Sequence, residues 1–184
     1  MNTQKHFQLG MDHLRKGHYE WAAKDFRNAI RSGGGSSMHW MALCAAHLQA
    51  HCCEDAINDC NQAEKLDPGN AKIPYYRAVA FMQQKMYQDA IDNLDIALER
   101  NPNYLPGILA RATCHNALGH EEAADEDVKD AMKYESAQVQ GFANEYGVLR
   151  THFDAFQAQM DGDRPMPRME MTQIQIDQLI ASLH

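Results

Sequence analysis

The chain has 184 residues and a formal net charge of −8 at pH 7. This acidic balance argues against a nucleic-acid partner, because phosphate binding needs clustered Lys and Arg. No apolar run reaches the ~18 residues of a membrane-spanning helix, and residues 1–17 lack the apolar region of a secretory signal. Five cysteines, an odd number, favour reduced thiols over a disulfide framework. We therefore expect a cytoplasmic protein that does not associate with a membrane.

A period of 34 residues organises the chain. Stepping by 34 keeps the class of residue constant in several columns of the alignment of the sequence with itself. The columns are Ala22, Ala56, Ala90 and Ala124; Ala29, Ala63, Ala97 and Ala131; the small residues Gly10, Cys44, Ala78 and Ala112; and the apolar residues Phe26, Cys60, Leu94 and Val128. The period predicts four repeats, at 3–36, 37–70, 71–104 and 105–138.

Each repeat is expected to contain two helices joined by a tight turn, because one amphipathic helix cannot bury its apolar stripe without stacked neighbours. Gly17 and Gly119 mark the turns inside the first and fourth repeats. Pro68 and Pro102 end the second and third repeats.

The second repeat carries a recognisable motif. Trp40, Leu43, Ala56, Cys60 and Pro68 resemble the tetratricopeptide pattern W-x2-L-G-x2-Y…A-x3-F…P. This resemblance implies an all-α fold, a right-handed solenoid of four helix–turn–helix repeats.

Beyond the repeats, the apolar pattern over residues 139–160 predicts a capping helix for the last repeat, since terminal units of such arrays are atypical. Residues 161–170 contain Pro165 and Pro167 and are predicted to be a linker. Residues 171–184 are predicted to form a short amphipathic helix, and a homodimer through this helix is one expectation for its role.

Metal binding and catalysis are both disfavoured. His47, His51, Cys52, Cys53 and Cys60 are close in sequence, which suggests a zinc site. However, the repeat register places His47 in a ring-shaped packing column and Cys60 in an apolar one, and Cys52–Cys53 lacks the spacing of a structural zinc site. We expect no metal, no cofactor and no catalytic residue, although an enzyme with an unrecognised site is the rival class.

The resemblance also implies a binding groove. In tetratricopeptide proteins the first helix of each repeat lines a concave groove, through positions 2, 5, 9 and 12 of the repeat. The groove residues expected here are Phe7, Met11, Leu14, Met38, Met41, Leu48, Lys72, Tyr75, Val79, Met82, Leu109 and Asn116, with Gln4, Ala45, Pro106 and Thr113 at the remaining positions. Methionine-rich surfaces can repack around varied partners. The alternative is that some of these side chains are core shared between neighbouring helices.

One subgroup of the family clamps the C-terminal carboxylate of heat-shock chaperones with Lys, Asn, Asn, Lys and Arg. The corresponding residues are Phe7, Met11, Ala42, Lys72 and Tyr76, of which only Lys72 matches. An apolar helix or extended segment is therefore the expected ligand, as for the tetratricopeptide chaperones of type III secretion.

The final segment carries a second resemblance. The stretch from Met171 to Ile180 is similar to the short N-terminal segment of bacterial flagellar switch proteins, M/L-S-Q-x-E-I-D-x-L-L, which docks on a response regulator. The residues that carry this resemblance are Met171, Gln173, Ile176, Asp177, Leu179 and Ile180. It implies a bacterial adaptor linked to chemotaxis, whereas docking of the segment on the groove of its own chain is the other reading.

The leading functional prediction is a non-enzymatic protein-interaction module, acting as an adaptor, scaffold or chaperone. Its partner is predicted to be a protein or peptide with an apolar segment. The fold does not identify that partner, because many functions share it.

Overall fold

The computed structural model describes residues 2–133, and this part of the chain is helical without strands. Its helices are α1 (Thr3–Arg15), α2 (Tyr19–Arg31), α3 (Ser37–Gln49), α4 (Cys53–Leu66), α5 (Lys72–Gln83), α6 (Tyr87–Arg100), α7 (Leu105–Ala117) and α8 (Glu121–Met132). The predicted segments 139–160, 161–170 and 171–184 lie outside the described residues. Within residues 2–133 no helix combines the length and the hydropathy needed to cross a membrane.

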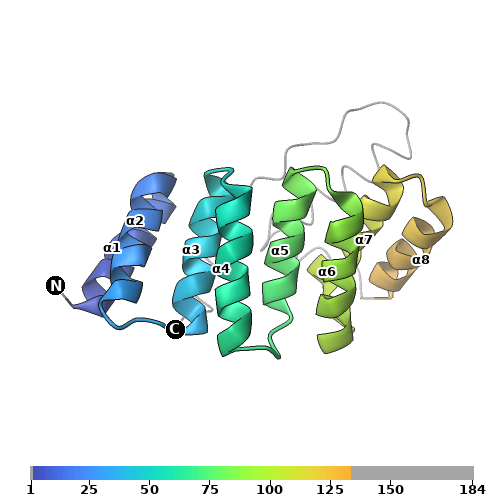
Figure 1. Ribbon diagram of the computed structural model, residues 1–184. Coiled ribbons are helices and arrows are strands. Elements are labelled where there is room, and N and C mark those ends of the chain that lie inside the picture. The colour runs from blue at the N-terminus through green and yellow to red at the C-terminus, as the bar shows by residue number, and fades with distance from the viewer. Residues whose placement is uncertain (1, 134–184) are drawn as a thin grey trace.

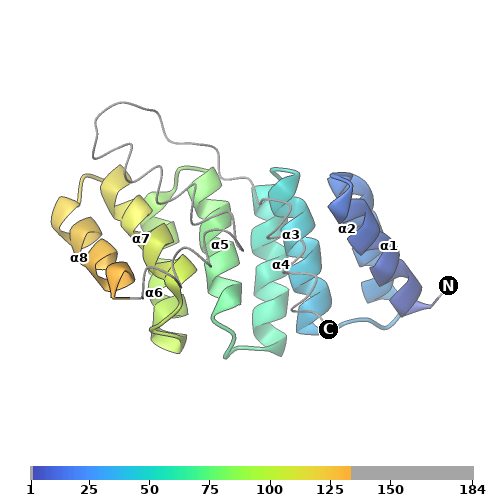
Figure 2. The same ribbon diagram turned by 180° about the vertical axis from the view of Figure 1, so that it is seen from behind.

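The helices stack as four antiparallel pairs in two layers. Each helix packs against the next one along the chain, and α3 also contacts α5. Figure 1 shows α2, α4 and α6 in the front layer, and the opposite view in Figure 2 brings α1, α3, α5 and α7 to the front. The all-α solenoid of paired helices predicted from the period is confirmed.

The turn inside each repeat has the same geometry. The residues with positive φ in these turns are Gly17, His51, Lys85 and Gly119, spaced by 34. In every case the next residue donates its N–H to the carbonyl five residues earlier at 2.9 Å, as in His18 N to His13 O. This closes the C-terminus of the first helix with a left-handed residue. The geometry recurs although only two of the four residues are glycine.

Alanine columns make the closest helix contacts. Ala22, Ala56 and Ala90 are completely buried, and Ala124 exposes only 3% of its surface. Their small side chains let the second helix of each repeat approach the first. The resulting core runs along the array in contiguous clusters, the largest of which extends from α3 to α7.

Candidate functional site

The candidate site is the face formed by α1, α3, α5 and α7, called here the groove face. Residues spaced by four along a helix share one side of it, so Met41, Ala45 and Gln49 lie along one side of α3. The equivalent residues of α5 are Tyr75, Val79 and Gln83. The groove face is defined by these positions and by Phe7 and Met11 of α1 and Leu109 and Thr113 of α7.

Most of the predicted groove residues are shielded from solvent. The buried ones expose between 0 and 6% of their surface: Met11, Leu14, Met41, Leu48, Tyr75, Val79, Met82 and Leu109. Phe7, Met38 and Asn116 are half-buried, and Lys72 is exposed. This shielding is as complete as in the core.

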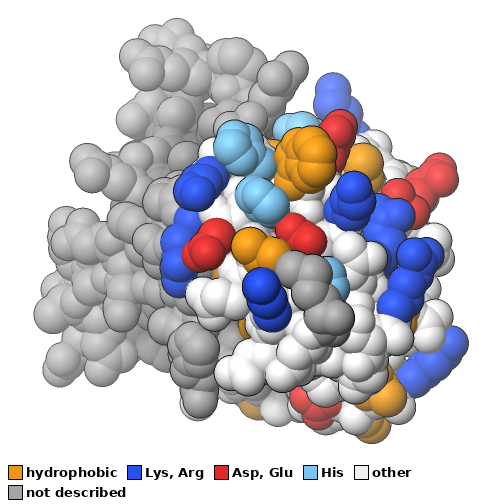
Figure 3. Space-filling view, turned by 90° about the vertical axis from the view of Figure 1, so that its left-hand side faces the viewer, with side chains coloured by type: hydrophobic (Ala, Val, Ile, Leu, Met, Phe, Trp, Pro, Cys, Tyr) orange, Lys and Arg blue, Asp and Glu red, His pale blue; other side chains and the backbone are white. Residues whose placement is uncertain are grey.

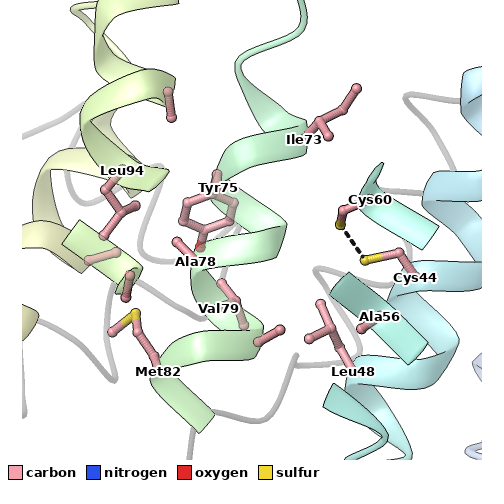
Figure 4. Close-up of a cluster of buried hydrophobic side chains, with 14 of the residues drawn as sticks. Cys44, Leu48, Ala56, Cys60, Ile73, Tyr75, Ala78, Val79, Met82 and Leu94 are labelled. Carbon is pink, nitrogen blue, oxygen red and sulfur yellow. Dashed lines mark hydrogen bonds between the residues drawn. The ribbon is translucent and has the colours of Figure 1, made fainter. Parts of the chain in front are cut away.

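The structure brings the predicted residues together in three groups. Met41, Leu48, Tyr75, Val79 and Met82 belong to the largest cluster, where they meet Cys44, Ala56 and Leu94 (Figure 4). Met11 and Leu14 belong to a second cluster, against which Phe7 packs. Leu109 lies in a third. Met38, Lys72 and Asn116 belong to none of these clusters.

Tyrosine rings line one part of this face. The ring of Tyr75 lies 5.5 Å from that of Tyr76 and 5.3 Å from that of Tyr104, both in edge-on geometry. Burial raises the pKa of the Tyr75 hydroxyl above its ordinary value, so this group stays protonated. Tyr104 was not among the sequence-predicted residues, because it precedes α7 instead of lying on it. Its place at the last position of the third repeat, next to the first helix of the fourth, is the signal that could have found it.

Two glutamines add polar groups to the apolar face. Gln83 donates from Nε2 to the Leu48 carbonyl at 3.3 Å and accepts from the Cys53 thiol at 3.2 Å. Gln49 is 93% buried, since only 7% of its surface is exposed, and its Nε2 has no hydrogen-bond partner. A buried donor without an acceptor costs about 1–3 kcal/mol. Gln49 is therefore an unusual residue, and its column escaped the sequence prediction.

Away from the groove face, ion pairs repeat with the same period. Arg77 bridges Asn61 and Asn93 at 2.8 and 2.6 Å, and Arg111, 34 residues later, bridges Asp95 and Asp127. Each arginine thus ties its own repeat to the preceding one. The bonds from Asp127 raise the pKa of the Arg111 guanidinium, which stays charged.

The histidine column forms polar pairs and not only ring packing. His47 donates from Nδ1 to Asp59 at 2.6 Å, and Arg27 donates to its Nε2 at 3.3 Å. Desolvation raises the pKa of the buried Asp59 carboxyl. The first repeat has the same arrangement in His13 and Asp25, 2.9 Å apart, at the end of the array where histidines gather on the surface (Figure 3). These pairs hold helices together and leave no carboxylate–imidazole pair aimed at a pocket.

The cysteines are free, and they are not arranged around a common centre. Cys44 and Cys60 are buried with their sulfurs 2.9 Å apart, whereas Cys52 is exposed and Cys53 is half-buried. Among the described residues, no group of three or more His, Cys, Asp and Glu side chains is placed to hold a metal ion.

The comparisons agree with this repeat architecture. Residues 46–104 match the family model described as Tetratricopeptide repeat. The DnaJ homolog subfamily C member 7 homolog of Schizosaccharomyces pombe is 32% identical over 90 residues, which cover 47% of this chain and 19% of that protein. The matched region therefore spans about a fifth of the relative's length.

Solved structures show the same fold. The crystal structure of MamA superposes with a TM-score of 0.69 at 16% identity and covers 76% of this chain and 81% of MamA. The first tetratricopeptide domain of Spaghetti (RPAP3), bound to the HSP90 peptide SRMEEVD, superposes with a TM-score of 0.60 at 18% identity. This match covers 64% of the chain and 94% of that domain. At this level of identity the likeness concerns the fold alone.

Proposed function

We propose that this chain, a tetratricopeptide-repeat protein by its period and its fold, is a non-enzymatic module that binds an apolar segment of another protein along the groove face. The observation that carries the proposal is the lining of that face. Met41, Tyr75, Val79 and Met82 come together from two neighbouring repeats, and the one charged residue among the predicted groove positions is Lys72. Such a lining favours an apolar helix or extended strand as the ligand.

The methionines suit this role. Their unbranched thioether side chains adapt to irregular surfaces, so a methionine-rich face can receive segments of different shape. Met11, Met41 and Met82 supply this property in three successive repeats. Their burial means that a partner must displace other contacts to reach them.

A chaperone carboxylate clamp is not part of the proposal. The RPAP3 domain binds a peptide with an acidic end, which needs clustered donors and cations. At the clamp positions this chain has Phe7 and Met11, which pack in an apolar cluster, and Ala42, which is completely buried. Lys72 is the one cation among them. Titration with SRMEEVD peptide should give no binding, and a tight complex that needs the terminal carboxylate would refute this part.

We further infer a cytoplasmic protein without catalytic activity. The support is the set of free cysteines and the use of the buried titratable groups in pairs between helices, such as His47 with Asp59.

The test is affinity capture from native extract, using variants that charge the groove face without disturbing the core. Met41 and Tyr75 are too deeply buried for this purpose, because an ionised side chain there would unfold the protein. Met38 is half-buried and Lys72 is exposed, at equivalent positions of successive repeats. The variant Met38→Glu with Lys72→Glu is expected to lose the captured partner while its helical circular dichroism is unchanged.

The matched control makes the same two changes elsewhere. Leu66 and Lys65 are exposed at the end of α4, outside the groove face, with Leu66 showing 52% of its surface. The variant Leu66→Glu with Lys65→Glu should capture the partner as the unmodified chain does. Equal capture by both variants would place the interface outside the groove face.

A further inference from the structure

We propose that residues 171–184 of this same chain occupy the groove face, so that an external partner binds by displacing them. The proposal rests on the proposed function of that face and adds a regulatory occupant to it.

The first argument is the shielding of the face. Met41, Tyr75, Val79 and Met82 expose only 5–6% of their surface. A groove that waits for a segment of another protein is open to water in the free chain, and its apolar lining is costly to hydrate. A groove with an occupant from its own chain is closed. The observed exposure matches the closed case.

The second argument is Gln49. Its Nε2 lies on the side of α3 that carries Met41 and Ala45, is buried, and lacks an acceptor. An occupant that supplies a carbonyl oxygen would remove this cost. The polar residues of the C-terminal segment fit this need, because they are mainly amides: Gln173, Gln175 and Gln178.

The third argument is the apolar pattern of the segment. Ile176, Leu179, Ile180 and Leu183 are spaced by three and four residues, which places them on one side of a helix. Asp177 is the one acidic residue in 171–184. A stripe of this kind on a nearly neutral segment complements an apolar face.

The fourth argument is reach. Residues 134–170 separate the end of the described array from the segment, and a chain of that length can span up to ~120 Å. The distance from α7 back to α3 is two repeats, on the order of 20 Å at the usual spacing of packed helices. A tether of this length gives an effective concentration on the order of millimolar, so even a weak contact is populated.

The test compares three full-length chains: the unmodified chain, Leu179→Asp with Ile180→Asp, and Gln178→Asp with Ala181→Asp. The last pair adds the same charge to the opposite side of the predicted helix and serves as the control. Oxidation of Met41 and Met82 by dilute hydrogen peroxide is followed by mass spectrometry. Met86 is the internal reference, because it exposes 42% of its surface outside the groove face.

Relative to Met86, Met41 and Met82 should oxidise roughly tenfold faster in the Leu179→Asp, Ile180→Asp chain, as expected for release of a segment that is docked about nine-tenths of the time. The control chain should behave like the unmodified one. A synthetic 171–184 peptide should then bind the Leu179→Asp, Ile180→Asp chain and not the unmodified chain, whose groove is filled. Circular dichroism verifies that all three chains remain folded.

Three results would overturn the proposal. The first is an equal oxidation rate in all three chains. The second is protection that increases with protein concentration together with a dimer in sedimentation, because the occupant would then come from a second copy. The third is a peptide that binds a phosphorylated response regulator and not the Leu179→Asp, Ile180→Asp chain. None of these results affects the Met38→Glu, Lys72→Glu capture test, so failure of this inference is distinguishable from failure of the proposed function.

Discussion

Gly10 and Phe26 fit together because one has no side chain. A Cβ added at Gly10 would lie 2.6 Å from Cε1 of the Phe26 ring, and that ring is completely buried. The same two columns hold Cys44 with Cys60, Ala78 with Leu94, and Ala112 with Val128 in the later repeats. The smallest residue therefore faces the largest, and the volume at this crossing is conserved between repeats.

This relationship predicts a reversal of sign in a double-mutant cycle. In the unmodified chain, Gly10→Ala should destabilise, because overpacking costs about 1–3 kcal/mol and exceeds the gain of up to ~1 kcal/mol in helix propensity. In the Phe26→Leu background, which reproduces the Ala78–Leu94 pair, the same substitution should be stabilising. Urea denaturation of the four chains measures the coupling. Additive effects would show that the ring does not restrict residue 10.

The left-handed turn residues give a second test by comparison between repeats. Lys85 has φ of 61° and Gly119 has φ of 76° at the equivalent position. A left-handed conformation costs an ordinary residue about 1–2 kcal/mol, whereas glycine loses an additional 0.5–1 kcal/mol or so of chain entropy on folding. Lys85→Gly should therefore stabilise by up to about 1 kcal/mol, and Gly119→Ala should destabilise by a similar amount. Thermal unfolding decides, and shifts of the same sign would contradict the shared geometry.

The fold was predictable from the sequence because the period is uninterrupted through the described repeats. Stepping from Ala56 by 34 residues locates each close helix contact, and α4 and α6 begin and end where the motif suggests. The turn at Lys85 shows what pattern alone misses. Sequence cues point to glycine for a left-handed residue, but neighbouring repeats impose that conformation on a lysine by fixing both flanking helices.

The candidate site was less predictable, because position within a repeat does not determine exposure. The register selects Met41 and Tyr75 as groove positions, yet it does not indicate that they expose as little surface as core residues. Nor does it show that Gln49 lacks a partner, since hydrogen bonding depends on atoms brought together from different repeats. The polar pairing of His47 with Asp59 was missed for the same reason.

The cysteines should differ sharply in reactivity. Burial raises the pKa of the Cys114 thiol to about 12 and also raises that of Cys44, so both remain protonated and unreactive near neutral pH. Cys52 is exposed and should react first with iodoacetamide at pH 8. Peptide mapping of the native protein should find Cys52 modified well before Cys44, Cys60 and Cys114. Simultaneous modification would contradict the packing of α3 against α4.

Stability should depend on pH through His39. Burial lowers the pKa of this imidazole below its ordinary value of 6.5, so the unfolded chain takes up a proton at a higher pH than the folded one. The free energy of unfolding should therefore decrease as the pH falls from about 6.5 towards the lowered folded pKa. His39→Gln removes this titration and should show a smaller drop in Tm between pH 7.5 and pH 5.5. An identical drop in both chains would assign the effect to other groups.

Arg77 and Arg111 occupy the same column, but their removal should have unequal consequences. The partners of Arg111 include Asp127, whose side chain is only 5% exposed, whereas Arg77 bonds to the neutral amides of Asn61 and Asn93. Arg111→Gln would leave a buried carboxylate without its counterion, at a cost of about 3–5 kcal/mol when such a pair is fully buried and less here because Arg111 is partly exposed. Arg77→Gln leaves neutral groups, for which a cost of about 1–2 kcal/mol is expected. The two free energies of unfolding from urea titrations should therefore differ, with Arg111→Gln the lower, and Arg111→Gln combined with Asp127→Asn should recover most of the loss. Equal losses for the two single variants, or no recovery in the double variant, would show that the ladder acts through packing of the arginine stems and not through the charge on Asp127.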